Sequence, residues 1–164
     1  MPGIAKHTSD QFTVQRASAE DSEAVWKIIG EYYEAARVIA RDARDDFFRI
    51  YFDDSAGVWL ATLERNVVGC IALRPLPAFA NSGEVKRLYV RSTYRGRGIA
   101  AALYRALEVY ARAFGYAWLY LDTAAEMIAA QKFYASLGFE LVPRYNDNPQ
   151  AAIFMRKDLR TSSE

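Results

Sequence analysis

The heptapeptide Y-R-G-R-G-I-A at residues 94–100 has the composition of an anion-binding turn. Glycine lets a backbone approach a ligand closely, and the first N–H groups of a helix have no partner within the helix, so they attract anions. Residues 84–90 before the turn read as a strand, and residues 99–114 after it have apolar side chains at helical spacing. The stretch from Val85 to Leu107 contains six basic residues and no acidic one. We therefore predict that the turn holds a phosphate group.

Two familiar phosphate-binding motifs do not fit this turn. A P-loop would need Gly-Lys-Ser/Thr after the glycines, and a dinucleotide-binding fingerprint would have a third glycine where Ala101 stands. The turn also comes late in the chain for a dinucleotide-binding domain. A tight turn into a helix, without any ligand, is the alternative interpretation of the glycines taken alone.

The scarcity of histidine and cysteine narrows the chemistry further. His7 is the only histidine and Cys70 the only cysteine, which argues against a Ser-His-Asp or Cys-His centre and against a metal site built from histidines. Cys70 stands between apolar residues and is expected to be buried and inert. A single cysteine forms no internal disulfide, as expected for a cytoplasmic protein.

Charge and hydropathy favour a protein that binds neither nucleic acid nor membrane. The net charge is +1, which gives no overall field toward polyanions. No stretch of about 18 apolar residues is available to span a bilayer, and the first residues lack the apolar core of a signal peptide. With 164 residues, 52% of them hydrophobic, the chain is expected to form a single domain, 1–164, with residues 1–10 flexible.

Hydrophobic periodicity predicts a mixed α/β or α+β domain. Expected strands lie at 12–16, 58–64, 67–74, 84–90, 117–122, 139–143 and 151–157, and expected helices at 18–36, 41–52, 99–114 and 123–138. Sequences typical of a capping box, Ser18–Asp21 and Thr123–Glu126, open the first and last helices. Arg65-Asn66 is the expected turn of a hairpin. The strand–helix–strand order of residues 84–122 predicts two parallel strands.

Two sequence blocks resemble the GNAT superfamily of N-acetyltransferases. Residues 84–100, E-V-K-R-L-Y-V-R-S-T-Y-R-G-R-G-I-A, are similar to its acetyl-CoA signature, Arg/Gln-x-x-Gly-x-Gly/Ala after a strand, with Arg95, Gly98 and Ala100 at the defined positions. Residues 129–139, A-A-Q-K-F-Y-A-S-L-G-F, look like the C-terminal helix motif of the same superfamily. The order of elements matches over nearly the whole chain, and other segments look like a bacterial subgroup.

The resemblance implies an acyl-CoA N-acyltransferase fold. In that fold a central mixed sheet of about six to seven strands is flanked by about four helices, and the parallel strands 84–90 and 117–122 splay apart to admit the pantetheine arm of acetyl-CoA. The implied cofactor-binding residues are Leu88, Tyr89 and Val90 for the pantetheine and thioester, and Arg95, Gly96, Arg97, Gly98, Ile99, Ala100 and Ala101 for the pyrophosphate. Arginine suits phosphate geometry, whereas a solvated surface charge is the expected role of Arg91, Arg105 and Arg112.

Tyr134 and Glu84 are the implied catalytic residues. The Tyr134 hydroxyl would protonate the departing CoA thiolate, since a phenol with a pKa of about 10 can donate to a thiolate whose acid has a pKa of about 8.5. Glu84 would remove the amine proton, directly or through water, and the Val90 N–H would hold the oxyanion. A core tyrosine and a surface carboxylate at a strand end are the alternatives for these two residues. Asp122 is a second candidate base, with a structural role, such as capping the next helix beside Thr123, as the favoured interpretation.

The resulting hypothesis is an N-acetyltransferase that moves the acetyl group of acetyl-CoA to a primary amine of a small molecule or peptide, without a metal. A CoA-binding sensor or interaction domain without turnover is the alternative, and the retention of Tyr134 favours the enzyme. The acceptor is expected between the first two helices and the loops 75–83 and 143–150. Exposed aromatic residues are expected on the second helix for an acceptor pocket or a homodimer interface, namely some of Phe47, Phe48, Tyr51 and Phe52. Met127 stands where many relatives have an asparagine that binds pantetheine, which puts that contact in doubt.

Overall fold

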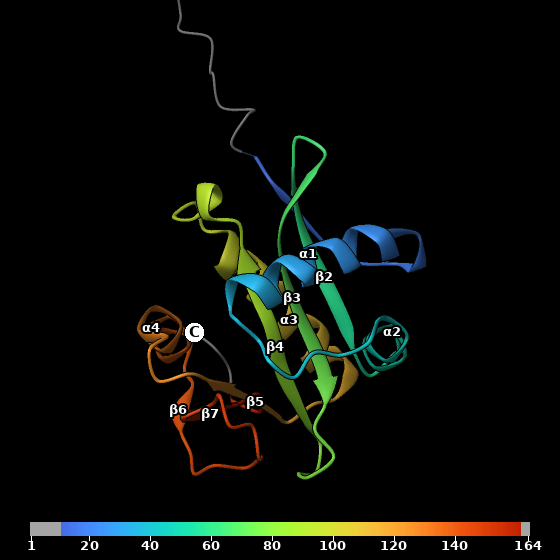
Figure 1. Ribbon diagram of the computed structural model, residues 1–164. Coiled ribbons are helices and arrows are strands. Elements are labelled where there is room, and N and C mark those ends of the chain that lie inside the picture. Colours follow the sequence, from blue (N-terminus) through green and yellow to red (C-terminus); the bar gives the residue numbers. More distant parts are fainter. Residues whose placement is uncertain (1–10, 162–164) are drawn as a thin grey trace, which may run out of the picture.

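A computed structural model describes residues 11–161 of the chain. Its seven-stranded sheet has the strand order β1-β2-β3-β4-β5-β7-β6 (Figure 1). The strands are β1 (Thr13–Arg16), β2 (Gly57–Leu63), β3 (Asn66–Pro75), β4 (Ser82–Val90), β5 (Trp118–Thr123), β6 (Glu140–Leu141) and β7 (Ile153–Asp158), and the α-helices are α1 (Ser22–Ala35), α2 (Arg44–Tyr51), α3 (Ile99–Phe114) and α4 (Ile128–Ser136). This is the predicted mixed α/β fold. The segment 1–10, which was expected to be flexible, lies outside the described residues.

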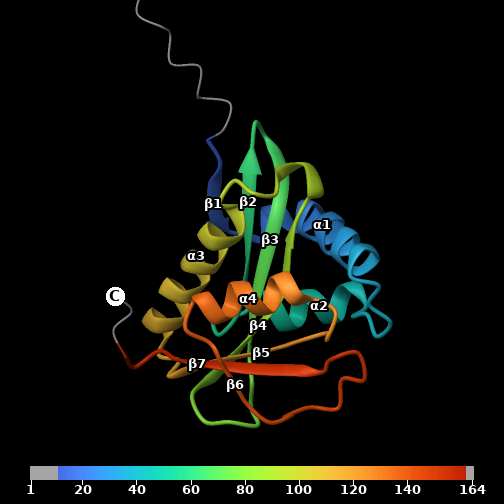
Figure 2. The ribbon, with the colours of Figure 1, turned by 90° about the vertical axis from the view of Figure 1, so that its left-hand side faces the viewer.

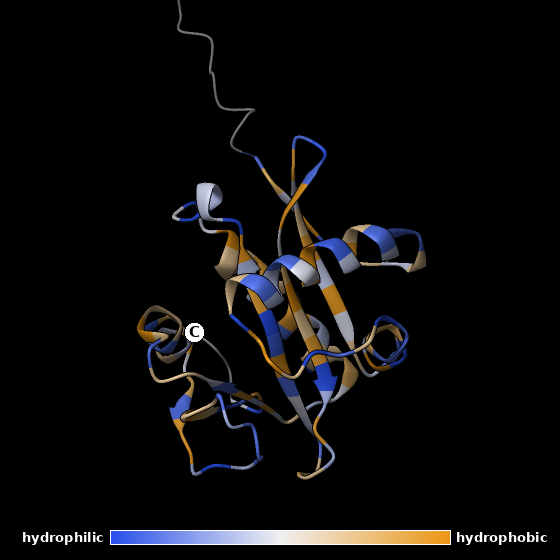
Figure 3. Cartoon of the chain, in the orientation of Figure 1, coloured by the Kyte–Doolittle hydropathy of each residue, from blue (hydrophilic) through white to orange (hydrophobic). Residues whose placement is uncertain are grey.

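The helices cover both faces of the sheet. α1 and α2 pack on one face, where Ile28 and Phe47 join a buried cluster with Cys70. α3 and α4 pack on the opposite face, where Leu107 and Tyr134 join a second cluster (Figure 2). Figure 3 shows hydrophobic residues concentrated along the strands between these helices. Cys70 is completely buried, as predicted, and burial raises the pKa of its thiol.

Local sequence explains where several elements begin and end. The β2–β3 hairpin turns at Glu64 and Arg65, which both have positive φ (50° and 69°), one residue earlier than expected. Before α1, the Asp21 carboxylate accepts a hydrogen bond of 2.8 Å from the Ser18 N–H, as the capping box predicts. Gly115, with φ of 112°, ends α3.

The structure corrects two expectations for the helices. The capping box predicted at 123–126 does not form, because β5 continues through Thr123, which pairs with Ile153 of β7. α4 begins only after this strand pairing has ended. On α2, Phe47 and Tyr51 are completely buried and belong to the core, so they are not the exposed aromatic residues expected there. Phe48 and Phe52 are partly exposed, as expected for some of the four.

Strands β4 and β5 are parallel but joined over a short length. Their register pairs Ser82 with Trp118, Gly83 with Leu119 and Glu84 with Tyr120. β4 continues to Val90 and β5 to Thr123 without further pairing between them in the described residues. Beyond Glu84 one edge of β4 therefore has no neighbouring strand (Figure 1). This confirms the predicted splay of the two strands.

β4 contains a bulge at Arg87. The β3–β4 register pairs Ala72 with Lys86 and Cys70 with Tyr89. Ile71 therefore faces two residues, Arg87 and Leu88, and Arg87 adopts a left-handed φ of 60°. Because of the extra residue, Lys86 and Arg87 both face α1 and α2. Lys86 pairs with Ala72, which belongs to the buried cluster on that face, and the Arg87 guanidinium lies over the Tyr33 ring. Two adjacent cations thus share one face of the sheet.

Candidate active site

The glycine-rich turn between β4 and α3 has the geometry of an anion site. Gly96 and Gly98 have φ of 79° and 80°, in the left-handed region that favours glycine. A Cβ atom added at either residue would meet no heavy atom within 4 Å, so the turn borders open space. α3 begins directly afterwards at Ile99, and the N–H groups of its first turn have no intrahelical partner. The backbone can therefore offer several donors to one anion.

Two exposed arginines accompany this turn. Arg95 donates from Nε to the carbonyl oxygen of Val90 at 3.0 Å, which fixes the turn against the end of β4. The Arg97 guanidinium lies 5.4 Å from the centre of the Tyr94 ring. The predicted pyrophosphate residues, 95–101, thus lie together at the start of α3, beside the open edge of β4.

Arg91 and Arg112 are not the solvated surface charges that the sequence suggested. Arg91 donates from Nε and Nη2 to the two carboxylate oxygens of Glu31, at 2.8 and 2.7 Å. Arg112 donates from Nε to Glu108 at 3.3 Å. Arg105 is exposed, as expected. Arg91 therefore joins the end of β4 to α1, Arg112 pairs within α3, and neither takes part in the turn.

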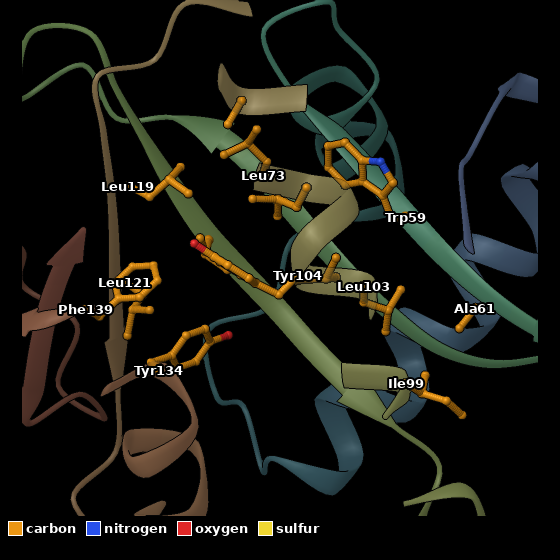
Figure 4. Packing of buried hydrophobic residues seen from close by; sticks show 14 of the residues in the cluster. Trp59, Ala61, Leu73, Ile99, Leu103, Tyr104, Leu119, Leu121, Tyr134 and Phe139 are labelled. Atoms are coloured by element: carbon orange, nitrogen blue, oxygen red, sulfur yellow. The ribbon is translucent and has the colours of Figure 1, made fainter. Parts of the chain in front are cut away.

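Tyr134 lies on α4 with 6% of its surface exposed. Its ring packs edge to face against Tyr104 of α3 and against Phe139 (Figure 4). None of the described residues makes a hydrogen bond with its hydroxyl, which Figure 4 shows turned away from Phe139. Burial raises the pKa of this phenol, so it stays protonated at neutral pH. A protonated hydroxyl without a protein partner is a suitable proton donor.

The sheet separates the predicted residues into two groups. Leu88, Val90 and Tyr134 belong to the cluster on the α3–α4 face. Tyr89 packs against the cluster on the α1–α2 face. Glu84 pairs with Arg74, which lies two residues along β3 from Ala72 of that cluster, so the Glu84 side chain faces the same side. The open edge of β4 lies between the two groups.

Glu84 is enclosed, with 1% of its surface exposed, so it is not the surface carboxylate considered as an alternative. Its Oε1 accepts a hydrogen bond from Arg74 Nε at 3.0 Å, and its Oε2 accepts one from the Tyr145 hydroxyl at 2.6 Å. Burial and the adjacent carboxylate raise the pKa of Tyr145, so this phenol stays protonated and donates. Both oxygens of the predicted base are therefore engaged.

Asp122 does not cap a helix, in contrast to the expectation. Asn146 donates from Nδ2 to Asp122 Oδ2 at 2.6 Å. Lys86 Nζ lies 3.7 Å from the other Asp122 oxygen and 3.8 Å from Glu84. Burial lowers the pKa of Lys86, and the two carboxylates oppose that change. Lys86 thus links β4 to β5 where the strands have separated.

A further buried ion pair, which the sequence did not predict, lies at the bulge. Arg87 donates from Nη2 to Asp42 Oδ2 at 3.1 Å. Its guanidinium lies 5.6 Å from the centre of the Tyr32 ring and 5.2 Å from that of Tyr33. Asp42 comes from the segment between α1 and α2, 45 positions earlier in the chain. No local sequence pattern signals a contact of that separation.

Within residues 11–161, no group of three or more His, Cys, Asp or Glu residues is arranged to hold a metal ion. No helix in the same part of the chain is long and apolar enough to cross a membrane. The candidate site therefore consists of backbone donors, phenols and ion pairs.

Comparisons with known proteins agree with this arrangement. A family model described as the acetyltransferase (GNAT) family matches residues 22–139, a span that includes the glycine turn and Tyr134. N-acetylaspartate synthetase of Xenopus tropicalis is 45% identical over 84 residues, which cover 51% of this chain and 31% of that protein. The chain therefore matches less than a third of the length of this curated relative.

Solved structures share the fold over almost the whole chain. A GNAT-family acetyltransferase from Staphylococcus aureus Mu50 has a TM-score of 0.77 at 21% identity, covering 91% of this chain and 99% of that one. The PaiA N-acetyltransferase from Thermoplasma acidophilum, solved in complex with coenzyme A, has a TM-score of 0.70 at 16% identity, covering 90% of this chain and 99% of that one. At these identities the similarity establishes the architecture of the sheet and helices.

Proposed function

Because the chain belongs to the GNAT acetyltransferase family, we propose that it transfers the acetyl group of acetyl-CoA to a primary amine. The proposal depends on one observation above all: the glycine turn, the open edge of β4 and the unbonded Tyr134 hydroxyl occur in one molecule. Each feature suits a different part of acetyl-CoA, namely the pyrophosphate, the pantetheine arm and the thioester sulfur. A phosphate-binding turn alone would not need the other two.

Residues 95–101 hold the pyrophosphate in this proposal. Their backbone N–H groups and the positive end of α3 attract the anion, and Arg95 and Arg97 add charge at the same place. The open edge of β4 at 88–90 offers backbone groups to the amides of pantetheine. Met127 is 45% exposed, and its side chain has no amide with which to make the pantetheine contact that asparagine makes in many relatives.

The proposed transfer is a direct one. Bound acetyl-CoA supplies an acetyl group activated as a thioester. The neutral amine attacks its carbonyl carbon, so that a C–N bond forms and the C–S bond breaks, while the amine loses one proton and the sulfur gains one. The Val90 N–H stabilises the negative charge that develops on the carbonyl oxygen, and Tyr134 donates a proton to the departing sulfur.

Glu84 remains our candidate for the final proton acceptor, and we place Tyr145 between it and the amine. An enclosed carboxylate cannot touch an acceptor directly, whereas the half-buried Tyr145 hydroxyl donates to it at 2.6 Å. Tyr145 would pass its proton to Glu84 as it takes one from the amine. Arg74, which donates to the other Glu84 oxygen, keeps the carboxylate in position.

A CoA-binding sensor without turnover is the competing proposal for the same fold. Such a protein would bind the cofactor through the turn and β4 but would gain nothing from a phenol at the sulfur. Tyr134 therefore favours an enzyme. By its name, the relative from Xenopus tropicalis makes an N-acetylated amino acid, which supports a small-molecule acceptor.

The first experiment is thermal unfolding with acetyl-CoA, CoA or ATP, followed by an assay of CoA thiol release with a panel of amines. A ligand at 100 times its Kd stabilises the folded state by about 2.7 kcal/mol, which raises the midpoint by about 5–10 °C for a domain of this size. We expect this shift with acetyl-CoA and CoA but not with ATP. No shift with millimolar acetyl-CoA would contradict the proposal, and a shift without thiol release from any amine would favour the sensor.

A further inference from the structure

The Arg87–Asp42 ion pair has the arrangement of a bound carboxylate. Two donors converge on Asp42 Oδ2: Arg87 Nη2 at 3.1 Å and the Tyr33 hydroxyl at 3.4 Å. The side chain of Arg87 is 10% exposed and that of Asp42 is 24% exposed, so water has little access to the pair. A guanidinium and a phenol that meet at one point form a donor set for carboxylate recognition.

Arg87 binds Asp42 through Nη2 alone, although a guanidinium can hold a carboxylate through both Nε and Nη2. Its Nε is buried and has no hydrogen-bond partner among the described residues. Arginine binds a carboxylate most strongly through two parallel N–H bonds, as Arg91 does when Nε and Nη2 bind Glu31 at 2.8 and 2.7 Å. A buried N–H without a partner is destabilising. Arg87 can therefore bind a carboxylate more completely than Asp42 allows.

The bulge also places Arg87 beside the backbone proposed to hold the thioester. Arg87 is followed directly by Leu88, but their side chains face opposite sides of the sheet. An acceptor whose amine and carboxylate are close together can reach both neighbouring positions. Lys86 is a poorer anchor, because it already lies between two carboxylates at 3.7 and 3.8 Å.

Asp42 belongs to a segment that is held mainly by polar contacts: the Asp42 N–H donates to the Tyr33 hydroxyl at 3.2 Å, and Arg41 donates to Glu34 at 2.7 Å. Residues 36–43 connect α1 to α2 without a helix or strand, and Ile39 in their middle is 81% exposed. Gln150 holds the segment by two hydrogen bonds: its Oε1 accepts from the Ile39 N–H at 3.0 Å, and its Nε2 donates to the Arg37 carbonyl at 2.9 Å. Moving Asp42 away from Arg87 would mainly break polar contacts, which water can replace.

We propose that the acceptor is a free amino acid whose carboxylate replaces Asp42 on Arg87 and Tyr33. This inference rests on the proposed acetyl transfer and names the acceptor class for the same site. Asp42 is a stand-in carboxylate that keeps Arg87 paired until the acceptor binds. A polyamine or a peptide N-terminus has no carboxylate beside its amine and would not use this anchor.

The test compares free L-amino acids, L-aspartate included, with their α-carboxamides, which keep the amine but lose the charge. CoA thiol release is measured for the wild type, for Arg87→Gln and for Arg91→Gln as the matched control. We expect the wild type to prefer its best amino acid over the carboxamide by about tenfold or more in kcat/KM. Arg87→Gln should lose this preference through a higher KM for the amino acid, and Arg91→Gln should keep it. If Arg87→Gln does not fold, Arg87→Lys takes its place, because lysine keeps the charge without the fork.

The outcomes separate this inference from the proposed function. A wild type that acetylates carboxamides as well as free amino acids would overturn the inference and leave acetyl transfer intact. An equal loss of preference in the Arg87 and Arg91 variants would overturn it too. If no amine leads to release of CoA, the proposed acetyl transfer is wrong. The inference is then tested by the binding of amino acids. Amino acids added to the CoA-bound protein should then raise the unfolding midpoint of the wild type and Arg91→Gln, but not that of Arg87→Gln, and an absent shift in the wild type would overturn it.

Discussion

Arg87 in β4 and Arg91 directly after it form ion pairs of different completeness. Arg91 binds both oxygens of Glu31 through Nε and Nη2, and its side chain is 29% exposed. Arg87 is 10% exposed, yet it donates only from Nη2 to Asp42 and its Nε is unpartnered among the described residues. The more exposed arginine has the complete pair, and the more buried one has the incomplete pair.

The two arginines differ in geometry and not in the kind of partner. Both residues lie in the same basic run of the sequence, K-R-L-Y-V-R, and both have an acidic partner. What separates them is how they meet their carboxylates: Arg91 binds Glu31 through both Nε and Nη2, whereas Arg87 binds Asp42 through Nη2 alone. The Nε of Arg87, buried beside a carboxylate that it does not bind, is a donor that a ligand carboxylate can satisfy.

The largest effect we expect is on turnover, from Tyr134→Phe. Loss of the proton donor should lower kcat by about 10²–10³-fold with little change in either KM. The loss should be equal for amino acids and for carboxamides, whereas changes at Arg87 should affect amino acids alone. Steady-state kinetics with both acceptor types measures this, with the unfolding midpoint as the control for folding. An unchanged kcat would remove Tyr134 from the mechanism.

The next largest effect should come from lysine substitutions, which distinguish the two arginines without removing a charge. Arg87→Lys should raise KM for the amino acid by about tenfold, since lysine lacks the planar fork. Arg91→Lys should change that KM by less than about twofold, because Arg91 touches no ligand in our proposal. Initial rates over a range of amino acid concentrations give both values. A similar rise in both variants would mean that the two sites do not differ in role.

Arg91 should instead contribute to stability, and this contribution should depend on pH. Arg91→Gln is expected to lower the free energy of unfolding by about 1 kcal/mol at pH 7, since the pair is bidentate but partly exposed. The hydrogen bond from Arg91 lowers the pKa of Glu31 below its usual 4.5. The pair therefore stabilises the protein above that value, and its contribution is lost as the pH falls through the lower pKa of the folded state.

Urea unfolding of the wild type and Arg91→Gln at pH 7 and at a series of pH values below 4.5 tests this expectation. The difference between the two proteins should shrink steadily as the pH falls through the series. A difference that stays constant would show that Arg91 acts through packing and not through the charge of Glu31.

The smallest effect should come from Asp42→Asn. Removing the stand-in charge weakens the contact that an acceptor carboxylate must replace, so KM for the amino acid should fall by about threefold. KM for the carboxamide should stay the same, which provides the internal control. A higher KM for the amino acid would indicate that Asp42 belongs to the acceptor site itself.

The features that sequence reasoning identified depend on short-range patterns. The turn at 94–100 and the helix around Tyr134 are specified by glycine, helical spacing and a neighbouring strand. The parallel order of β4 and β5 followed from the strand–helix–strand sequence. In these cases the residues that decide the structure are adjacent to the residues they position.

The features that sequence reasoning missed depend on contacts between distant segments. The bulge at Arg87 results from the register of β3 against β4, which no single strand encodes. The partner of Arg87 comes from 45 positions away. At Thr123, pairing with β7 extends the strand and overrides a local sequence that favours a helix start. Tertiary contacts decide all of these positions.

The short join between β4 and β5 has a mechanical consequence. The sheet consists of two panels, β1–β4 and β5–β7, and between residues 11 and 161 the seam joining them contains three residue pairs of backbone register. Past that point the panels are linked by side chains, through Tyr145 to Glu84 and through Lys86 to Asp122. We expect the panel with fewer strands to open first in hydrogen exchange, as a separate cooperative unit. A cofactor bound along the seam would join the two panels. The whole sheet should then open as one cooperative unit in hydrogen exchange.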